Sequence, residues 1–408
     1  MTTSQTQRRA IIVGGSLGGL FAANLLIRNG WQVKVFERVP EALAGRGAGI
    51  VTHPELLEAL AAAGVKVDES LGVQVPARVT LNRDGSIDSE KELPQLLTAW
   101  SKMYHVLHSA FPAEFYHSGR SVRVVENLAD HARVVLDDDS VHEADLVVAA
   151  DGFRSAIRQQ MLPEVALQYA GYVAWRGLVD EGQLSVEARQ ALFNRFAFCL
   201  PPHEQMLGYP VAGAQNSTEQ GERRYNFVWY RATREDTDLV SMLTDDTGKC
   251  WSNGIPPTLI RQEVLETMRT AAHDLLAPAF AEVVDNTQQP LFQPIYDLEV
   301  PRMNEGRIAL LGDAAFVARP HCGMGVAKAA GDAVALVAAL AQDIPVPEAL
   351  ARYSEQRTAF GTAIVQHARH LGAYMQAQLL SDHDREMAER YRTPEAVMRE
   401  TAVPPALQ

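Results

Sequence analysis

The chain has 408 residues, of which 47% are apolar and 21% are charged. These proportions are typical of a globular protein with a large core, and they exclude a low-complexity chain. Its 37 basic and 50 acidic residues give a formal net charge of −13. This acidic balance argues against a nucleic-acid partner, because binding to phosphate backbones needs a basic surface.

The first predicted element is a strand over residues 10–13, followed by a glycine-rich turn and a helix over 20–29 that Gly30 ends. Arg8 and Arg9 ahead of an uncharged stretch imitate a signal peptide, but the glycines inside that stretch favour a strand, a turn and a helix. We therefore expect no membrane segment. Residues 32–36 alternate polar and apolar side chains and predict the next strand.

Further along the chain, apolar patterns predict helices over 54–63 and 96–111, and strands over 122–125, 132–136, 141–142 and 146–150. From residue 166 to 300, aromatic strand-like pieces replace the helical pattern, at 171–179, 196–200, 206–209 and 225–230. We interpret this region as an inserted, mostly antiparallel sheet that also holds a helix over 261–276. A strand over 307–311, a helix over 325–341 and helical residues 349–392 follow, and the end of the chain at 403–405 is expected to fray.

Three motifs carry candidate chemistry. The first is Gly14-Gly15-Ser16-Leu17-Gly18-Gly19, which follows a strand and opens a helix, as a dinucleotide fingerprint requires. Small residues there let a pyrophosphate approach the start of the helix, and Glu37, at the end of the second strand, can accept hydrogen bonds from a ribose. The sequence therefore predicts a dinucleotide site; the bland alternative is a plain α/β turn.

The second motif spans residues 145–158, where a buried strand delivers Asp151 and Gly152 to a loop and Arg158 follows on a helix. An ordinary helix cap with a surface arginine explains it equally well. The third motif spans 306–332, where a strand ends at Gly312-Asp313 and a loop from His321 to Gly325 opens a helix. Asp313 can bind a ribityl or ribose hydroxyl, and the amides at the helix start can stabilise an anion. The alternative is a glycine-rich loop ahead of a core helix.

In order and spacing, the three motifs resemble the FAD-dependent aromatic hydroxylases of the para-hydroxybenzoate hydroxylase type, over most of residues 10–360. Several strings are similar to the 2,6-dihydroxypyridine 3-hydroxylase subgroup, namely GGSLGGL at the first turn, GIVTHPEL at 49–56, YAGYVAWRG at 169–177 and ARPHCGMGVAKAAGDA at 318–333. The resemblance implies an α/β fold in which a Rossmann-like FAD-binding domain carries an inserted, mostly antiparallel β-sheet substrate domain and a C-terminal helical segment.

The resemblance also implies a division of the chain. Residues 1–75, 101–165 and 301–370 form the FAD-binding domain, residues 76–100 and 166–300 the substrate domain, and residues 371–408 the C-terminal helix and tail. It implies cofactor contacts at the adenosine end, in the central loop and at the flavin, from Gly14, Gly15, Ser16, Leu17, Gly19, Glu37, Arg38, Arg46, Gly47, Asp151, Gly152, Arg158, Asp313, Gly323, Met324 and Gly325.

Substrate-side candidates rest on weaker signals. Arg176 and Tyr209 are candidate cavity liners, and His53 and His321 lie beside the expected flavin loops, where either could take a substrate proton. Further possible liners are Tyr172, Trp175, Trp229 and Tyr230. For each aromatic residue the alternative is packing within the sheet, and Arg176 could also lie at a strand edge.

The sequence gives no support to several other kinds of chemistry. The three cysteines, Cys199, Cys250 and Cys322, form neither a disulfide framework nor a metal-binding pair, which favours a reducing cytoplasm. We expect no metal, because no second ligand pair accompanies His367 and His370.

The resulting expectation is a cytoplasmic FAD-dependent monooxygenase that hydroxylates a small electron-rich aromatic ring, most simply a hydroxypyridine. The resemblance implies bound FAD, NADH or NADPH as a transient co-substrate, dioxygen, a flavin C4a-hydroperoxide and a possible homodimer, with no nucleic-acid or membrane partner. Two alternatives stay open. One is another flavin-dependent oxidoreductase, either a reductase or a hydroxylase of a different ring, and the other is a flavin-binding sensor without turnover.

Overall fold

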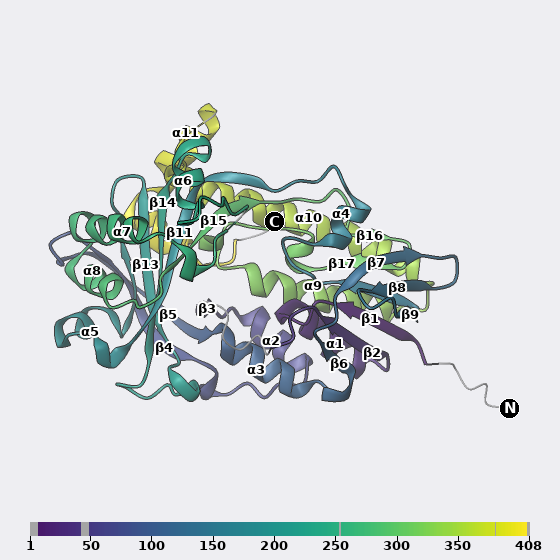
Figure 1. The fold of residues 1–408 in the computed structure, drawn as a ribbon. Coiled ribbons are helices and arrows are strands. Elements are labelled where there is room, and N and C mark those ends of the chain that lie inside the picture. Colours follow the sequence, from purple (N-terminus) through teal and green to yellow (C-terminus); the bar gives the residue numbers. More distant parts are fainter. Residues whose placement is uncertain (1–6, 42–48, 253, 380, 406–408) are drawn as a thin grey trace.

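The computed structural model describes residues 7–41, 49–252, 254–379 and 381–405. Figure 1 shows a six-stranded sheet toward one end of the molecule, an eight-stranded sheet toward the other, and helix α9 (Gly325–Leu340) between them. The six-stranded sheet has the order β16 (Asn304–Glu305), β17 (Ile308–Leu310), β10 (Leu146–Ala149), β1 (Arg9–Val13), β2 (Gln32–Glu37) and β6 (Tyr116–Ser118). Its strands are parallel except for the antiparallel pair of β16 and β17.

The N-terminal strand, turn and helix form the β-α-β unit that the sequence predicts. The apolar run of β1 is buried between β2 and β10, and α1 (Leu17–Arg28) crosses from β1 to β2. The helix begins at Leu17, three residues earlier than expected. The reason is that Gly18 and Gly19 lie inside the first turn of the helix, where the close approach of α1 to β1 leaves no space for a side chain at Gly19.

The eight-stranded sheet has the order β15 (Leu291–Asp297), β11 (Gln168–Asp180), β14 (Arg224–Ala232), β13 (Glu204–Val211), β12 (Arg195–Cys199), β4 (Val73–Leu81), β5 (Ile87–Ala99) and β3 (Gly49–Val51). All neighbours are antiparallel except β12 and β4. The fold class predicted from the sequence is confirmed. The domain boundaries stay a prediction, and β3 pairs within this sheet although it lies inside residues 1–75.

The expected helix over 96–111 is wrong at its start. Leu97, Thr98 and Ala99 end the long strand β5, where they pair with β3 and Leu97 also faces β4, and α3 (Trp100–Ala110) begins only after them. Their side chains are buried in the sheet, and this tertiary pairing outweighs the local helical pattern.

Two hydrophobic cores lie on opposite faces of the eight-stranded sheet. On one face the core is continuous with α1, α3, α9, α10 (Val346–Gly372) and α2 (Pro54–Ala62). On the other face, α5 (Val186–Leu192), α7 (Gln262–Leu275) and α8 (Pro278–Asp285) cover the sheet. The remaining elements include α4 (Ala156–Met161), the short α6 (Val240–Met242) and a small sheet of β7 (Val122–Asn127), β8 (Ala132–Leu136) and β9 (Val141–Ala144).

The C-terminal region differs from the expected continuous helix. Helix α10 ends at Gly372, and α11 (Asp382–Tyr391) starts anew at a capping box of Ser381 and Asp384. A last helix, α12 (Pro394–Glu400), packs against β4 and β5, and Thr401 and Ala402 after it are buried. Within the described part of the chain, no helix is both long and apolar enough to span a membrane.

Candidate active site

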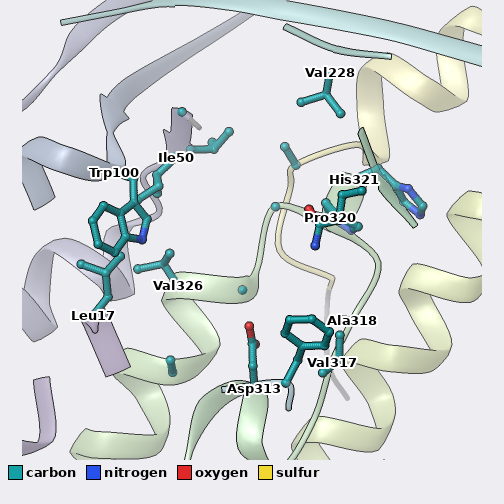
Figure 2. Close-up of a pocket in the computed structure, with 18 of the residues that line it drawn as sticks. Leu17, Ile50, Trp100, Val228, Asp313, Val317, Ala318, Pro320, His321 and Val326 are labelled. Carbon is teal, nitrogen blue, oxygen red and sulfur yellow. The ribbon is translucent and has the colours of Figure 1, made fainter. Parts of the chain in front are cut away.

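A cavity of about 450 Å³ lies between the two large sheets. Its walls come from the α1 turn, the loops after β10 and β17, the start of α9 and one face of the eight-stranded sheet. Figure 2 shows Leu17, Trp100 and Val326 on one side, His321 and Val228 on another, and Asp313 pointing in from below. The three sequence motifs thus meet around one space, together with strand residues from the inserted region.

The glycine turn after β1 packs closely against neighbouring backbone, which leaves no space for side chains at two of its glycines. Gly14 has φ +101°, and a Cβ there would lie 2.4 Å from the Ala150 carbonyl oxygen, while a Cβ at Gly19 would lie 1.9 Å from the Gly14 oxygen. Ser16 and Leu17 line the cavity, and the Ser16 side chain makes no capping bond. The first amides of α1 are therefore left for an anionic group such as a pyrophosphate.

Glu37 holds this turn from behind. One carboxylate oxygen accepts a hydrogen bond from the Gly15 amide at 2.8 Å, and the other accepts one from the Val39 amide at 2.9 Å. Arg38 is exposed on the surface. The predicted contacts at Arg46 and Gly47 fall outside the described residues.

The loop after β10 is tied to the loop after β17. The buried Arg158 guanidinium donates to the Phe153 oxygen at 2.8 Å and to the Ala314 oxygen at 3.1 Å. Asp151 caps α4 by accepting from the Ala156 amide, and its second oxygen is buried without a partner among the described residues. Burial raises the pKa of Asp151. Gly152 has φ +82° and lines the cavity.

Beneath Asp313, buried charges hold the loop after β17. Asp332 on α9 accepts from the Gly312 amide at 3.1 Å and from Arg357 at 2.6 Å. Lys328, only 1% exposed, lies 3.8 Å from Asp332, and its ammonium has no hydrogen-bond partner among the described residues. The Asp313 carboxylate faces the cavity; burial raises its pKa, and nearby Lys328 lowers it. A ribityl or phosphate group bound at Asp313 would lie in the field of this buried lysine.

The start of α9 supplies the opposite wall. Gly323 and Gly325 line the cavity, and open space lies where a Cβ of Gly325 would be. Met324 is buried and precedes the first turn of α9, which lacks a side-chain cap. Amides at this helix start are therefore available to a negatively charged flavin edge.

Both candidate histidines are hydrogen-bonded to backbone oxygens, and of the two His321 lines the cavity. His53 is 3% exposed and donates through Nε2 to the Gly323 oxygen at 3.2 Å, and burial lowers its pKa. His321 donates through Nε2 to the Ala368 oxygen at 2.8 Å, its Nδ1 is buried without a partner among the described residues, and burial lowers its pKa to about 3. Its ring points away from Asp313 in Figure 2. The proton-acceptor role of either residue stays a prediction.

The substrate end is an aromatic wall with one cation. Alternation along β11, β13 and β14 turns Arg176, Tyr209 and Tyr230 toward the cavity. Trp175 and Trp229 point to the opposite face and belong to the second core. Within the described part of the chain, the Arg176 guanidinium has no hydrogen bond or ion pair, and its Nε is buried. Burial raises the pKa of Tyr209 and Tyr230, and the charge of Arg176 opposes that rise.

Sequence reasoning missed three parts of the lining. They are Trp100 at the start of α3, residues 293–296 of β15, and Thr401 and Ala402 after α12. Tertiary folding brings these residues to the cavity, and none belongs to a local motif. The described residues contain no cluster of three or more metal-ligating side chains.

These features fit FAD. Two helix starts present amides without side-chain caps, and Asp313 lines the same cavity with a carboxylate that makes no hydrogen bond to a described residue. An extended dinucleotide would be held by these three features.

Comparison with known proteins supports this interpretation. Residues 169–297 match a family model described as FAD binding domain-like, and residues 266–368 match one described as FAD binding domain. A curated relative, 2,6-dihydroxypyridine 3-monooxygenase of Paenarthrobacter nicotinovorans, is 29% identical over 91% of this chain and 93% of its own length. The 3-amino-4-hydroxybenzoate 2-monooxygenase of Streptomyces cremeus is also 29% identical, over 89% of this chain and 86% of its own length.

The solved structure of 2,6-dihydroxypyridine-3-hydroxylase from Arthrobacter nicotinovorans superposes with a TM-score of 0.85, at 28% identity, over 92% of this chain and 94% of that one. Over nearly its full length, the chain is similar to FAD-dependent aromatic hydroxylases. Its cofactor is FAD. The motif residues described above are therefore the candidates for holding that cofactor.

Proposed function

We propose that this hydroxylase acts on a small, anionic, electron-rich ring, with a dihydroxypyridine as the preferred class, and uses NADH or NADPH and dioxygen as co-substrates. The observation that carries the proposal is Arg176, a guanidinium without a partner among the described residues in an otherwise aromatic and aliphatic wall. A pyridinediol loses a ring proton easily, and its anion is both electron-rich and flat. The resemblance to a 2,6-dihydroxypyridine 3-monooxygenase over nearly the full length supports the same class.

Arg176 would bind the ionised ring oxygen. In a cavity of low polarity the attraction between a guanidinium and an oxyanion is much stronger than in water, and it lowers the pKa of the bound ring hydroxyl. The planar guanidinium can also donate two hydrogen bonds side by side. Tyr209 and Tyr230, which flank Arg176, present flat faces and hydroxyl groups that would orient the ring.

Bound FAD supplies electron transfer from the nicotinamide and activation of dioxygen. The protein residues supply the environment. Phe196, Leu207 and Val228 line the cavity next to Arg176 and exclude water from the ring, which protects the reaction from unproductive loss of the activated oxygen. The helix start at Gly325 would stabilise negative charge on the neighbouring flavin edge.

A second candidate substrate class is an aromatic acid. One relative is named for 3-amino-4-hydroxybenzoate, and a carboxylate would satisfy Arg176 as well as an ionised ring oxygen would. The two classes differ in the position of their negative charge, so a substrate panel separates them.

The test is a panel of hydroxypyridines and hydroxybenzoates given to the FAD-loaded enzyme, with NADH consumption and product mass as readouts. We expect the fastest product formation with a dihydroxypyridine. Arg176→Met should raise KM for it by about 10- to 100-fold, because hydrogen bonds to a charged group contribute roughly 1.5–3 kcal/mol. Arg176→Lys should recover part of that loss.

Arg123→Met is the matched control, since the exposed Arg123 on β7 pairs with Asp139 and should leave KM unchanged. Two results contradict the proposal. One is substrate-independent NADH oxidation with no hydroxylated product from any ring. The other is an Arg176→Met enzyme that keeps the wild-type KM.

A further inference from the structure

The last described segment of the chain is built into the molecule. Thr393 caps α12 by accepting from the Ala396 amide, and the helix packs on β4 and β5. Residues 396–398 are buried, and so are Thr401 and Ala402. In Figure 2 the pale yellow coil of this segment passes beside Pro320 and His321. We name residues 393–402 the C-terminal wall segment.

One buried arginine holds this segment. Arg78 on β4 is 0% exposed, and it donates to the Met398 oxygen at 2.9 Å, the Thr401 oxygen at 2.6 Å and the Ala402 oxygen at 3.4 Å. Gln95 accepts the remaining donors at 2.9 and 2.7 Å, and no carboxylate of the described residues pairs with it. A buried guanidinium needs all its hydrogen bonds satisfied, so these contacts fix the position of the backbone that accepts them.

The anchored residues reach the cavity at its junction with the flavin-side loop. The Ala402 amide donates to the His321 oxygen at 2.8 Å, and Thr401 and Ala402 both line the cavity. Gln205 on β13 donates to the Thr401 hydroxyl at 3.4 Å. Beneath the Arg78 guanidinium, at 4.9 Å, lies the ring of Phe196, which lines the substrate end. The segment therefore touches both the aromatic wall and the loop that precedes α9.

A close approach at Gly323 shows how tightly the segment is seated. A Cβ at Gly323 would lie 2.7 Å from the Ala402 Cα, and Ala402 itself has φ +52°, a backbone conformation that costs an alanine about 1 kcal/mol. Strain of this kind persists where neighbouring contacts fix the backbone, and Arg78 and His321 supply those contacts here.

We infer that the C-terminal wall segment sets the size of the ring that this hydroxylase accepts, with Thr401 and Ala402 as specificity-determining residues and Arg78 as the positioning residue. The inference rests on the proposed function, because it describes the substrate end of the same cavity. A fixed wall favours a single six-membered ring and rejects a fused two-ring substrate. Loosening the wall should admit the larger ring and hold the smaller one less firmly.

The first test is Arg78→Met, which keeps the bulk of the side chain and removes its hydrogen bonds. Hydrogen–deuterium exchange should rise over residues 394–402 and stay unchanged over residues 9–37, and FAD content should stay at the wild-type level. KM for a dihydroxypyridine should rise about 10-fold or more, and more NADH should be oxidised without product. Arg195→Met, on the neighbouring strand β12 in an ion pair with the half-exposed Glu90, is the matched control and should change none of these.

The second test is Thr401→Ala, which trims the wall without removing its anchor. The ratio of kcat/KM for a dihydroxyquinoline to that for a dihydroxypyridine should rise about 10-fold. This is the usual size of the change in kcat/KM when a substrate differs by a few atoms inside a pocket. If Arg78→Met does not fold, this ratio alone decides. An unchanged ratio in Thr401→Ala, with FAD bound, overturns the inference.

The two proposals fail in different ways. An enzyme that hydroxylates no ring refutes the proposed function. In that case, the size preference of the wall can still be measured by equilibrium binding of the same ring panel. The change in flavin absorbance reports this binding. If the wild type and Thr401→Ala bind one-ring and two-ring ligands in the same ratio, the wall does not select for size.

Discussion

Most side chains around the cavity are uncharged or are hydrogen-bonded to the backbone. At the substrate end, Arg176 is the exception. His321 illustrates the first group. Its Nε2 donates a hydrogen bond to the Ala368 oxygen, the Tyr172 ring stacks on the imidazole, and the Tyr230 ring contacts it edge-on. A group whose pKa is about 3 is a weak acceptor near neutral pH, so the structure favours a positioning role for His321 toward the loop ahead of α9.

Burial of His321 predicts how stability depends on pH. The pKa of this histidine falls from 6.5 when unfolded to about 3 when folded, so its contribution is complete above pH 6.5 and is lost as pH falls below that value. At pH 5.5 the loss is about 1.4 kcal/mol relative to neutral pH. His321→Gln should remove this part of the pH dependence. Urea unfolding at pH 7.5 and 5.5 measures it, and an equal decline in both proteins would show that His321 is not responsible.

Among the elements, the sequence predicts the turn between β1 and α1 and the start of α9. Each rests on glycines whose role is local: a turn, a helix start or a positive φ. The end of β5 could not be predicted in this way. Leu97 and Thr98 are buried only because β3 and β4, far away in sequence, flank them, and a local helical pattern cannot report that.

The close contact between α1 and β1 predicts how a methyl group added at Gly19 affects stability and FAD binding. Gly19→Ala would place a Cβ 1.9 Å from the Gly14 oxygen, so the helix must move away from the strand. We expect a loss of about 1–3 kcal/mol in the free energy of unfolding, as is usual for overpacking, together with much weaker FAD retention. Gly182→Ala is the control, because nothing lies within 4 Å of its Cβ position. Denaturant unfolding and FAD content measure both effects, and wild-type FAD retention in Gly19→Ala would contradict the account.

For the whole molecule, the sequence predicted which motifs meet but not everything that surrounds them. The FAD side was predictable because its residues follow strands that are neighbours in the parallel part of the sheet, so that their carboxyl ends meet at one edge. The substrate side draws on β11 to β15 and on the C-terminal wall segment, which no local motif predicts. Buried anchors such as Arg78 carry no sequence signature. The homodimer and the cytoplasmic location stay predictions.

The central claim is that this cavity holds FAD and an ionised aromatic ring together so that one atom of dioxygen enters the ring. The most direct measurement supplies the FAD-loaded enzyme with NADH, a dihydroxypyridine and isotopically heavy dioxygen in ordinary water, and determines the product mass. We expect a product that carries one heavy oxygen atom, in amounts that match NADH consumption. A product whose new oxygen comes from water, or NADH oxidation with no oxygenated ring, would contradict it.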